Sequence, residues 1–89
     1  MIQTQLTIIN KLGLHARAAA KFVACTSAFS SSIQVGKDGQ QVDGKSIMSV
    51  MLLAAGKGSV LELEIQGSDE EAALEALKTL IENRFHEAE

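Results

Sequence analysis

The sequence predicts an α+β fold, in which four short strands and three helices follow the order β-α-β-β-α-β-α, with the helices on one face of the sheet. Apolar and polar residues alternate over residues 2–8 and 60–66, which is typical of half-buried strands. Helix-forming residues without a breaker fill residues 16–27. Asp38-Gly39 between two short apolar stretches indicates a hairpin, because a type I′ turn needs positive φ at both central residues.

Length and composition limit the chain to one domain, residues 1–89, with one core. A net charge of −3 and only three aromatic residues, all Phe, argue against a nucleic-acid partner. Cys25 is the single cysteine, so we expect no internal disulfide and no multi-cysteine metal site, but a small buried thiol. No segment approaches the roughly 20 apolar residues of a membrane span. These features predict a cytoplasmic protein without membrane insertion.

Each helix has a predicted beginning, and the first and third also have a predicted buried face. The buried face of the first helix, Ala16 to Ser27, comprises Ala19, Phe22, Val23 and Thr26. Ser46 is a good N-cap for a second helix that runs to Ala54 or Ala55. A capping box over Ser68–Glu71 starts the third helix. Its apolar stripe comprises Ala73, Leu74, Leu77, Leu80, Ile81 and Phe85.

The segment Gly13-Leu14-His15-Ala16-Arg17 carries the strongest chemical signal. His15 falls at the cap of the first helix, whose first N–H groups have no partner within that helix. These groups and the positive end of the helix dipole attract anions. A single histidine before a helix is often only an exposed cap, but a nucleophilic nitrogen beside a guanidinium at this place suggests a phosphoryl acceptor. The other histidine, His86, lies in an acidic end and is expected to be solvated.

Residues 39–46 match the nucleotide P-loop pattern G-x-x-x-x-G-K-[ST]. Gly39 belongs to the predicted hairpin, however, and no second apolar strand ends in Asp to hold magnesium. Nucleotide hydrolysis is therefore not expected, and the sequence predicts neither a cofactor nor a metal site.

The second helix offers two further candidate sites. The capping role alone explains why a serine stands at position 46. The helix dipole would nevertheless also favour a regulatory phosphate on Ser46. Its apolar residues surround the whole helix, so either packing is unusually complete or Ile47, Met48 and Met51 form an exposed partner patch.

In these residues, the chain resembles the histidine-containing phosphocarrier proteins (HPr) of the bacterial phosphotransferase system. The resemblance rests on size, element order, Gly-Leu-His-Ala-Arg, the Ala-Ala-x-Phe-Val continuation and Gly-Lys-Ser-Ile-Met. It implies an open-faced β-sandwich with a four-stranded antiparallel sheet covered by three helices. It also implies a monomer that acts as a phosphoryl-transfer intermediate rather than as a free-standing enzyme.

The resemblance assigns a role to each candidate residue. His15 would carry the phosphate on Nδ1, and Arg17 would face it. The donor would be enzyme I, itself charged by phosphoenolpyruvate, and the acceptors enzyme IIA-type proteins. Ser46 matches a serine that a dedicated kinase phosphorylates in many members. The residues that match the partner-docking surface are Ala16, Ala20, Ile47, Met48 and Met51.

The chain departs from the family's usual pattern at Ala18, where proline is common, and at Ala24 and Ser27, where some members carry lysine. Alanine still favours the helix. A regulatory protein-interaction module that signals through the patch at residues 47–51 is the alternative function, and a small-ligand-binding domain ranks last. Residues alone do not separate the sugar-transport branch of the system from its nitrogen-related regulatory branch.

Overall fold

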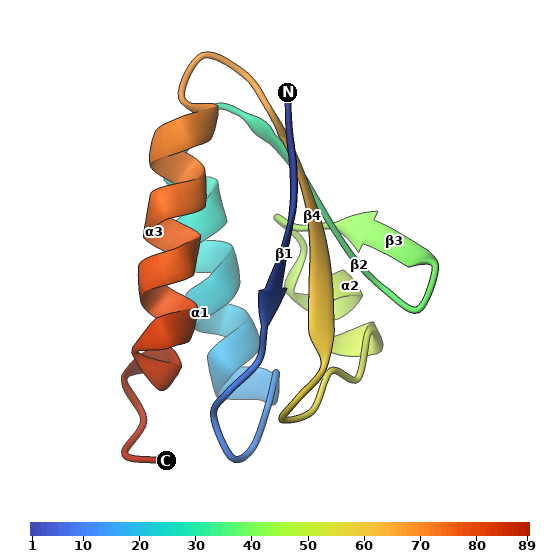
Figure 1. Cartoon of the computed structure of the whole chain (residues 1–89), viewed down its shortest axis with the longest axis vertical. Coiled ribbons are helices and arrows are strands. Elements are labelled where there is room, and N and C mark those ends of the chain that lie inside the picture. Colours follow the sequence, from blue (N-terminus) through green and yellow to red (C-terminus); the bar gives the residue numbers. More distant parts are fainter.

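The computed structural model describes all of residues 1–89, and its elements follow the predicted order (Figure 1). The strands are β1 (Ile2–Thr7), β2 (Ser32–Lys37), β3 (Gln40–Asp43) and β4 (Val60–Gln66). The helices are α1 (Ala16–Ser27), α2 (Ile47–Leu52) and α3 (Glu70–Glu82), followed by the short 3-10 helix η1 (Arg84–His86). The α+β prediction is confirmed, and α1 runs between the predicted residues.

The strands form one antiparallel sheet in the order β1-β4-β2-β3. The first and last strands are neighbours, with Ile2 opposite Ile65. The β2–β3 hairpin turns at Asp38 and Gly39, whose φ angles of 53° and 85° are both positive. The predicted hairpin is therefore confirmed.

The core lies between one face of this sheet and the helices, with α1 and α3 side by side (Figure 1). Leu61, Leu63 and Ile65 of β4 are buried, as their alternation predicts. All four residues predicted for the buried face of α1 are buried, together with Ala18. Full burial of a side chain such as Phe22 stabilises the fold by roughly 1.5–3 kcal/mol. This packing holds the beginning of α1 in place.

The second helix is shorter than predicted, because α2 ends at Leu52 rather than at Ala54 or Ala55. Ala54 has a φ of 51°, which lies in the left-handed region and cannot continue the helix. The ammonium group of Lys37 donates to the carbonyl oxygens of Leu53 and Ala54 at 3.4 and 3.2 Å. A contact from β2 thus satisfies carbonyl groups that the end of the helix leaves free.

The capping box predicted at Ser68 is wrong. Asp69 is the N-cap of α3, and its side chain makes no capping bond. Its carboxylate instead accepts hydrogen bonds from the backbone N–H groups of Ser30 and Ser31 at 2.9 and 3.0 Å. A tertiary contact that ties α3 to the loop after α1 has replaced the local cap.

Phe85 reaches the core by a route that helical periodicity does not describe. It is fully buried, as predicted, although α3 already ends at Glu82. Arg84, Phe85 and His86 have φ angles of 54°, 55° and 64°, so the chain turns in the left-handed region. The turn returns the phenyl ring to the core and directs the following residues towards the beginning of α1.

The thiol of Cys25 is half-buried, whereas the sequence predicted a buried one. Partial burial disfavours the thiolate and raises the pKa of Cys25 above its ordinary value. Because the thiolate is the reactive form, the side chain is a poor nucleophile at neutral pH.

Candidate functional site

The loop between β1 and α1 fixes the position of His15. Gly13 has a φ of 65°, and a Cβ atom there would lie 2.4 Å from the carbonyl oxygen of Ala55. Leu14 donates its backbone N–H to the same oxygen at 2.8 Å, and its side chain is buried. Only glycine allows this close approach at a positive φ. The chain after α2 therefore supports the residues directly before His15.

His15 is the N-cap of α1, as predicted, with extended backbone angles of −69° and 175°. No side chain caps the helix, and its first turn contains no acidic residue. The first N–H groups and the positive end of the dipole are therefore left for an anion. Arg17 is exposed and takes part in none of the ion pairs of the protein. His15 therefore lies at an uncapped helix end with free N–H donors, and an unpaired arginine follows two residues later.

The imidazole of His15 has a partner that sequence reasoning missed. Its Nε2 atom forms a short contact with Oε2 of Glu87, and the two side chains are 27% and 16% exposed. Oε1 of the same carboxylate accepts a hydrogen bond from Nδ2 of Asn10 at 2.9 Å. The Asn10 amide, followed by the hydrogen bond to the His15 ring and by the charge of Lys21, lowers the pKa of Glu87 against the opposing effect of burial. Glu87 is therefore a carboxylate at neutral pH.

Ser46 lies at the other predicted site, as the N-cap of α2. Its hydroxyl oxygen accepts a hydrogen bond from the backbone N–H of Ser49 at 3.3 Å. The prediction that Ser46 caps this helix is confirmed. Thr26 of α1 donates its hydroxyl to the carbonyl oxygen of Gly44 at 2.8 Å, so the segment before Ser46 is tied directly to α1.

Exposed apolar side chains gather on α2, which packs against α1. Ile47, Met48 and Met51 are exposed, with Met48 at 73%. The predicted docking patch consists of these three residues together with Ala16 and Ala20, both exposed on α1. No helix of the protein is both long enough and apolar enough to cross a bilayer. Sequence reasoning missed two further exposed apolar residues, Leu12 in the loop before α1 and Leu52 at the end of α2.

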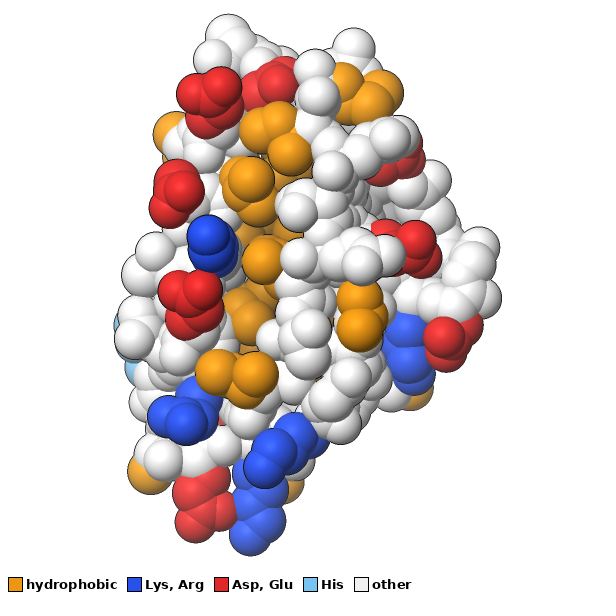
Figure 2. Space-filling model, in the orientation of Figure 1, with side chains coloured by type: hydrophobic (Ala, Val, Ile, Leu, Met, Phe, Trp, Pro, Cys, Tyr) orange, Lys and Arg blue, Asp and Glu red, His pale blue; other side chains and the backbone are white.

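Basic side chains gather at the end of the molecule where the C-terminus lies (Figures 1 and 2). Lys11, Lys57 and Arg84 line a shallow depression there with Ile9, Ala88 and Glu89. One carboxylate offsets part of this charge, because Nζ of Lys11 lies 3.2 Å from Oε2 of Glu89. No local pattern predicts this cluster, since its three basic residues come from three separate segments.

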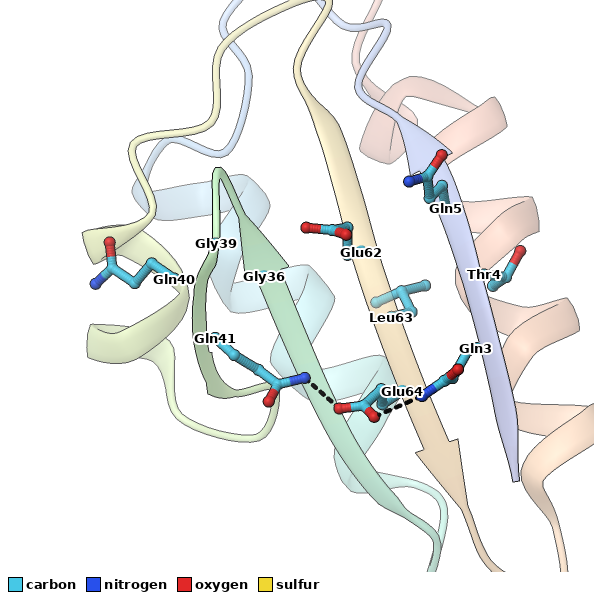
Figure 3. Close-up of a pocket in the computed structure, with 10 residues that line it drawn as sticks. All are labelled: Gln3, Thr4, Gln5, Gly36, Gly39, Gln40, Gln41, Glu62, Leu63 and Glu64. Atoms are coloured by element: carbon cyan, nitrogen blue, oxygen red, sulfur yellow. Dashed lines mark hydrogen bonds between the residues drawn. The ribbon is translucent and has the colours of Figure 1, made fainter.

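A second depression lies on the open face of the sheet (Figure 3). Glu64 lies between Gln3 and Gln41 and accepts hydrogen bonds from both side-chain amides. Leu63 is the only hydrophobic residue in its lining, whereas small-molecule sites are lined mostly by hydrophobic side chains. None of the candidate site residues lines it. No three His, Cys, Asp or Glu side chains come close enough together to hold a metal ion.

The chain is similar to known proteins over most of its length. A family model described as "PTS HPr component phosphorylation site" matches residues 2–83. The phosphocarrier protein HPr of Cupriavidus necator is 55% identical over 89 residues, which are 100% of both chains. The crystal structure of HPr-C-His from Thermoanaerobacter tengcongensis has a TM-score of 0.95 and 48% identity, and covers 100% of each chain. The expected open antiparallel sheet with three helices is thereby confirmed.

A further solved structure, that of an HPr dimer from Thermoanaerobacter tengcongensis, has a TM-score of 0.78 and 49% identity. It covers 98% of this chain and 100% of that chain. The same fold therefore occurs in a protein that assembles as a dimer.

Proposed function

Because this chain belongs to the HPr family of phosphocarrier proteins of the phosphotransferase system, we propose that His15 is its phosphoryl acceptor. The observation that carries this proposal is the place of His15 at the uncapped N-terminus of α1. Its ring is partly exposed, so a phosphorylated partner reaches it without unfolding the domain. No other histidine has this setting, since His86 is exposed in η1.

The transfer is an in-line displacement with metaphosphate-like character. The lone pair of Nδ1 bonds to phosphorus as the bond from phosphorus to the donor atom of enzyme I breaks. The next transfer reverses these roles when a nucleophile of an enzyme IIA-type protein attacks the phosphohistidine. Arg17 and the N–H groups of residues 16–18 stabilise the phosphoryl oxygens. An exposed site of this kind holds the group moderately, which suits a carrier.

The partners dock on the apolar patch formed by Ala16, Ala20, Ile47, Met48 and Met51. The strongest support is the exposure of Met48 at 73%, since a helix of a small domain ordinarily buries its large apolar residues. Methionine is flexible and polarizable, so one patch can fit both enzyme I and enzyme IIA-type acceptors. The protein works in the cytoplasm, where both partners meet it.

Ser46 is the proposed regulatory site, phosphorylated by a serine kinase. A phosphate on its hydroxyl would lie at the positive end of α2 and directly before the docking patch. The added negative charge would change partner docking without touching His15.

The carrier is proposed to act as a monomer, although one similar protein is a dimer. Its patch must be free to bind two different partners in succession. Size-exclusion chromatography with light scattering at several protein concentrations tests this proposal, and a constant dimer mass would overturn it.

A regulatory interaction module remains the second candidate function, and the same exposed patch favours it. In that case the phosphorylation state would be read by a partner rather than passed on. A variant without His15 would then still bind the partner and produce the same output.

Incubation with enzyme I, magnesium and phosphoenolpyruvate tests the acceptor role. We expect one added phosphate by intact mass, lost in acid and stable in base, and absent from His15→Ala. Arg17→Ala should load more slowly but to the same extent. Loading of His15→Ala to the same extent as the wild type would refute the assignment.

A further inference from the structure

The segment that follows α3 returns to the beginning of α1 and places a carboxylate on His15. Oε2 of Glu87 contacts Nε2 of the ring, and Oε1 accepts from Nδ2 of Asn10 at 2.9 Å. The same Nδ2 atom donates to the carbonyl oxygen of Gly13 at 2.9 Å. Asn10, which makes both bonds, is fully buried. Glu87 therefore joins the imidazole to the loop that precedes it, although 72 residues separate the two side chains.

Contacts on both sides of Glu87 hold it in this position. On one side, Phe85 is fully buried, and its backbone carbonyl oxygen accepts a hydrogen bond from Nζ of Lys21 at 2.5 Å. On the other side, Lys11 donates its backbone N–H to a backbone oxygen of Glu89 at 2.6 Å. Figure 1 shows the C-terminus at the same end of the molecule as the loop before α1. The carboxylate is thus presented by an anchored segment.

The contact selects between the two ring nitrogens. An ionised carboxylate can only accept hydrogen bonds, so Nε2 must carry the proton. In a neutral imidazole the lone pair is then on Nδ1. Glu87 is ionised at neutral pH, because Asn10, His15 and Lys21 lower its pKa. The contact therefore leaves Nδ1 as the nucleophilic atom.

We propose that Glu87, held by Asn10, is a positioning residue for phosphoryl transfer at His15. It fixes the imidazole in the Nε2–H form and orients Nδ1 towards the incoming phosphorus atom. This proposal rests on the proposed function, because it concerns the same histidine.

The charges of the step balance without a proton transfer. When the Nδ1–phosphorus bond forms and the donor's bond to phosphorus breaks, Nε2 keeps its proton and the ring gains a positive charge. The carboxylate of Glu87 faces that charge. A carboxylate that orients a histidine and stabilises its cationic form is a recurrent device in active sites. When the phosphoryl group leaves, the electrons of the Nδ1–phosphorus bond return to Nδ1, and the ring is neutral again.

Two variants separate this role from the general effect of a negative charge in the segment. Glu87→Gln removes the charge that faces His15. Glu89→Gln makes the same chemical change two residues away, where the carboxylate pairs with Lys11 at 3.2 Å and is 69% exposed. Nitrogen-15 NMR of the unphosphorylated protein reports whether Nε2 holds a proton that is protected from exchange with water. This readout does not depend on enzyme I.

We expect a protected Nε2–H in the wild type and in Glu89→Gln, and its loss in Glu87→Gln. Loading by enzyme I should slow about tenfold in Glu87→Gln, the lower end of the effect of orienting groups on metal-binding histidines. The loss should appear in kcat rather than in KM. Equal NMR signals and equal rates in the two variants would overturn the proposal. Failure of the wild type to load would refute the proposed function, whereas a Glu87-dependent Nε2–H would still establish the positioning contact.

Discussion

Gly13 packs against the backbone of Ala55 so closely that a Cβ atom on Gly13 would lie 2.4 Å from the Ala55 carbonyl oxygen. Through this contact the chain after α2 supports the loop that presents His15. Replacing Gly13 by alanine should therefore destabilise the fold in two ways, through its φ of 65° and through the clash. We expect a loss of roughly 3 kcal/mol of unfolding free energy.

Gly39 provides a matched control, since its φ is 85° but no atom lies within 4 Å of its Cβ position. Gly39→Ala should cost only the conformational part, roughly 1 kcal/mol. Urea unfolding of both variants checks the difference. Equal losses would mean that the contact with Ala55 contributes nothing.

Asp69 makes the stability of the protein depend on pH in the acid range. The Ser31 hydroxyl, followed by the Ser30 backbone N–H, lowers the pKa of Asp69 to about 2 from an ordinary value of 3.8. A carboxylate with a depressed pKa contributes stability above its unfolded-state pKa and loses it as pH falls through its folded-state pKa. The unfolding free energy of the wild type should therefore fall between about pH 4 and pH 2.

Asp69→Asn removes this titration, so its difference from the wild type should be large at pH 7 and shrink towards pH 2. Ser31→Ala removes the strongest donor and should reduce the pH-dependent part while leaving the carboxyl group in place. Urea unfolding at several pH values measures both. Parallel profiles of wild type and Asp69→Asn across this range would show that the carboxylate is not held as described.

Substitutions of Ser46 separate its capping role from its proposed regulatory role. Ser46→Ala removes the acceptor for the Ser49 N–H and should cost about 1 kcal/mol. Ser46→Asp keeps an N-cap acceptor and adds a charge that the helix dipole favours, so its stability should match the wild type. Its KM towards partners should nevertheless rise. An unchanged KM for Ser46→Asp would argue against control of docking by charge at this position.

Met48 tests the docking patch, because it is 73% exposed and its side chain contributes little to the core. Met48→Lys should change the unfolding free energy by less than about 0.5 kcal/mol. We expect its KM for enzyme I to rise about tenfold, which corresponds to the loss of one well-buried apolar contact at the interface. Val60→Thr alters an exposed apolar residue outside the patch and should leave the KM unchanged. Equal KM values for Met48→Lys and the wild type would exclude this residue from the interface.

Local signals predicted most of the fold and the centre of the site. His15 and Ser46 could be placed at helix caps because capping depends on residues close in sequence. The β2–β3 turn and the buried residues of β4 follow from turn chemistry and from alternation. All of these features depend on residues that are close in sequence and not on contacts between distant segments.

The features that the sequence did not predict depend on distant segments. The carboxylate of Asp69 accepts hydrogen bonds from the loop at Ser30 and Ser31 instead of from its own helix, so a local capping rule fails there. Glu87 reaches His15 only because Arg84, Phe85 and His86 adopt positive φ angles, which are uncommon for residues other than glycine. Neither periodicity nor motifs could therefore predict that the carboxylate of Glu87 contacts His15.

In the proposed function, His15 takes up a phosphoryl group that then moves on to a second protein. The direct measurement starts from protein loaded by enzyme I and phosphoenolpyruvate and then freed of enzyme I. This phosphorylated protein is mixed with an enzyme IIA-type protein, and the intact masses of both chains are followed over time. We predict that the phosphate lost from this chain equals the phosphate gained by the acceptor, and that His15→Ala delivers none. Phosphate that stays on this chain, or that appears only as free inorganic phosphate, would contradict the account.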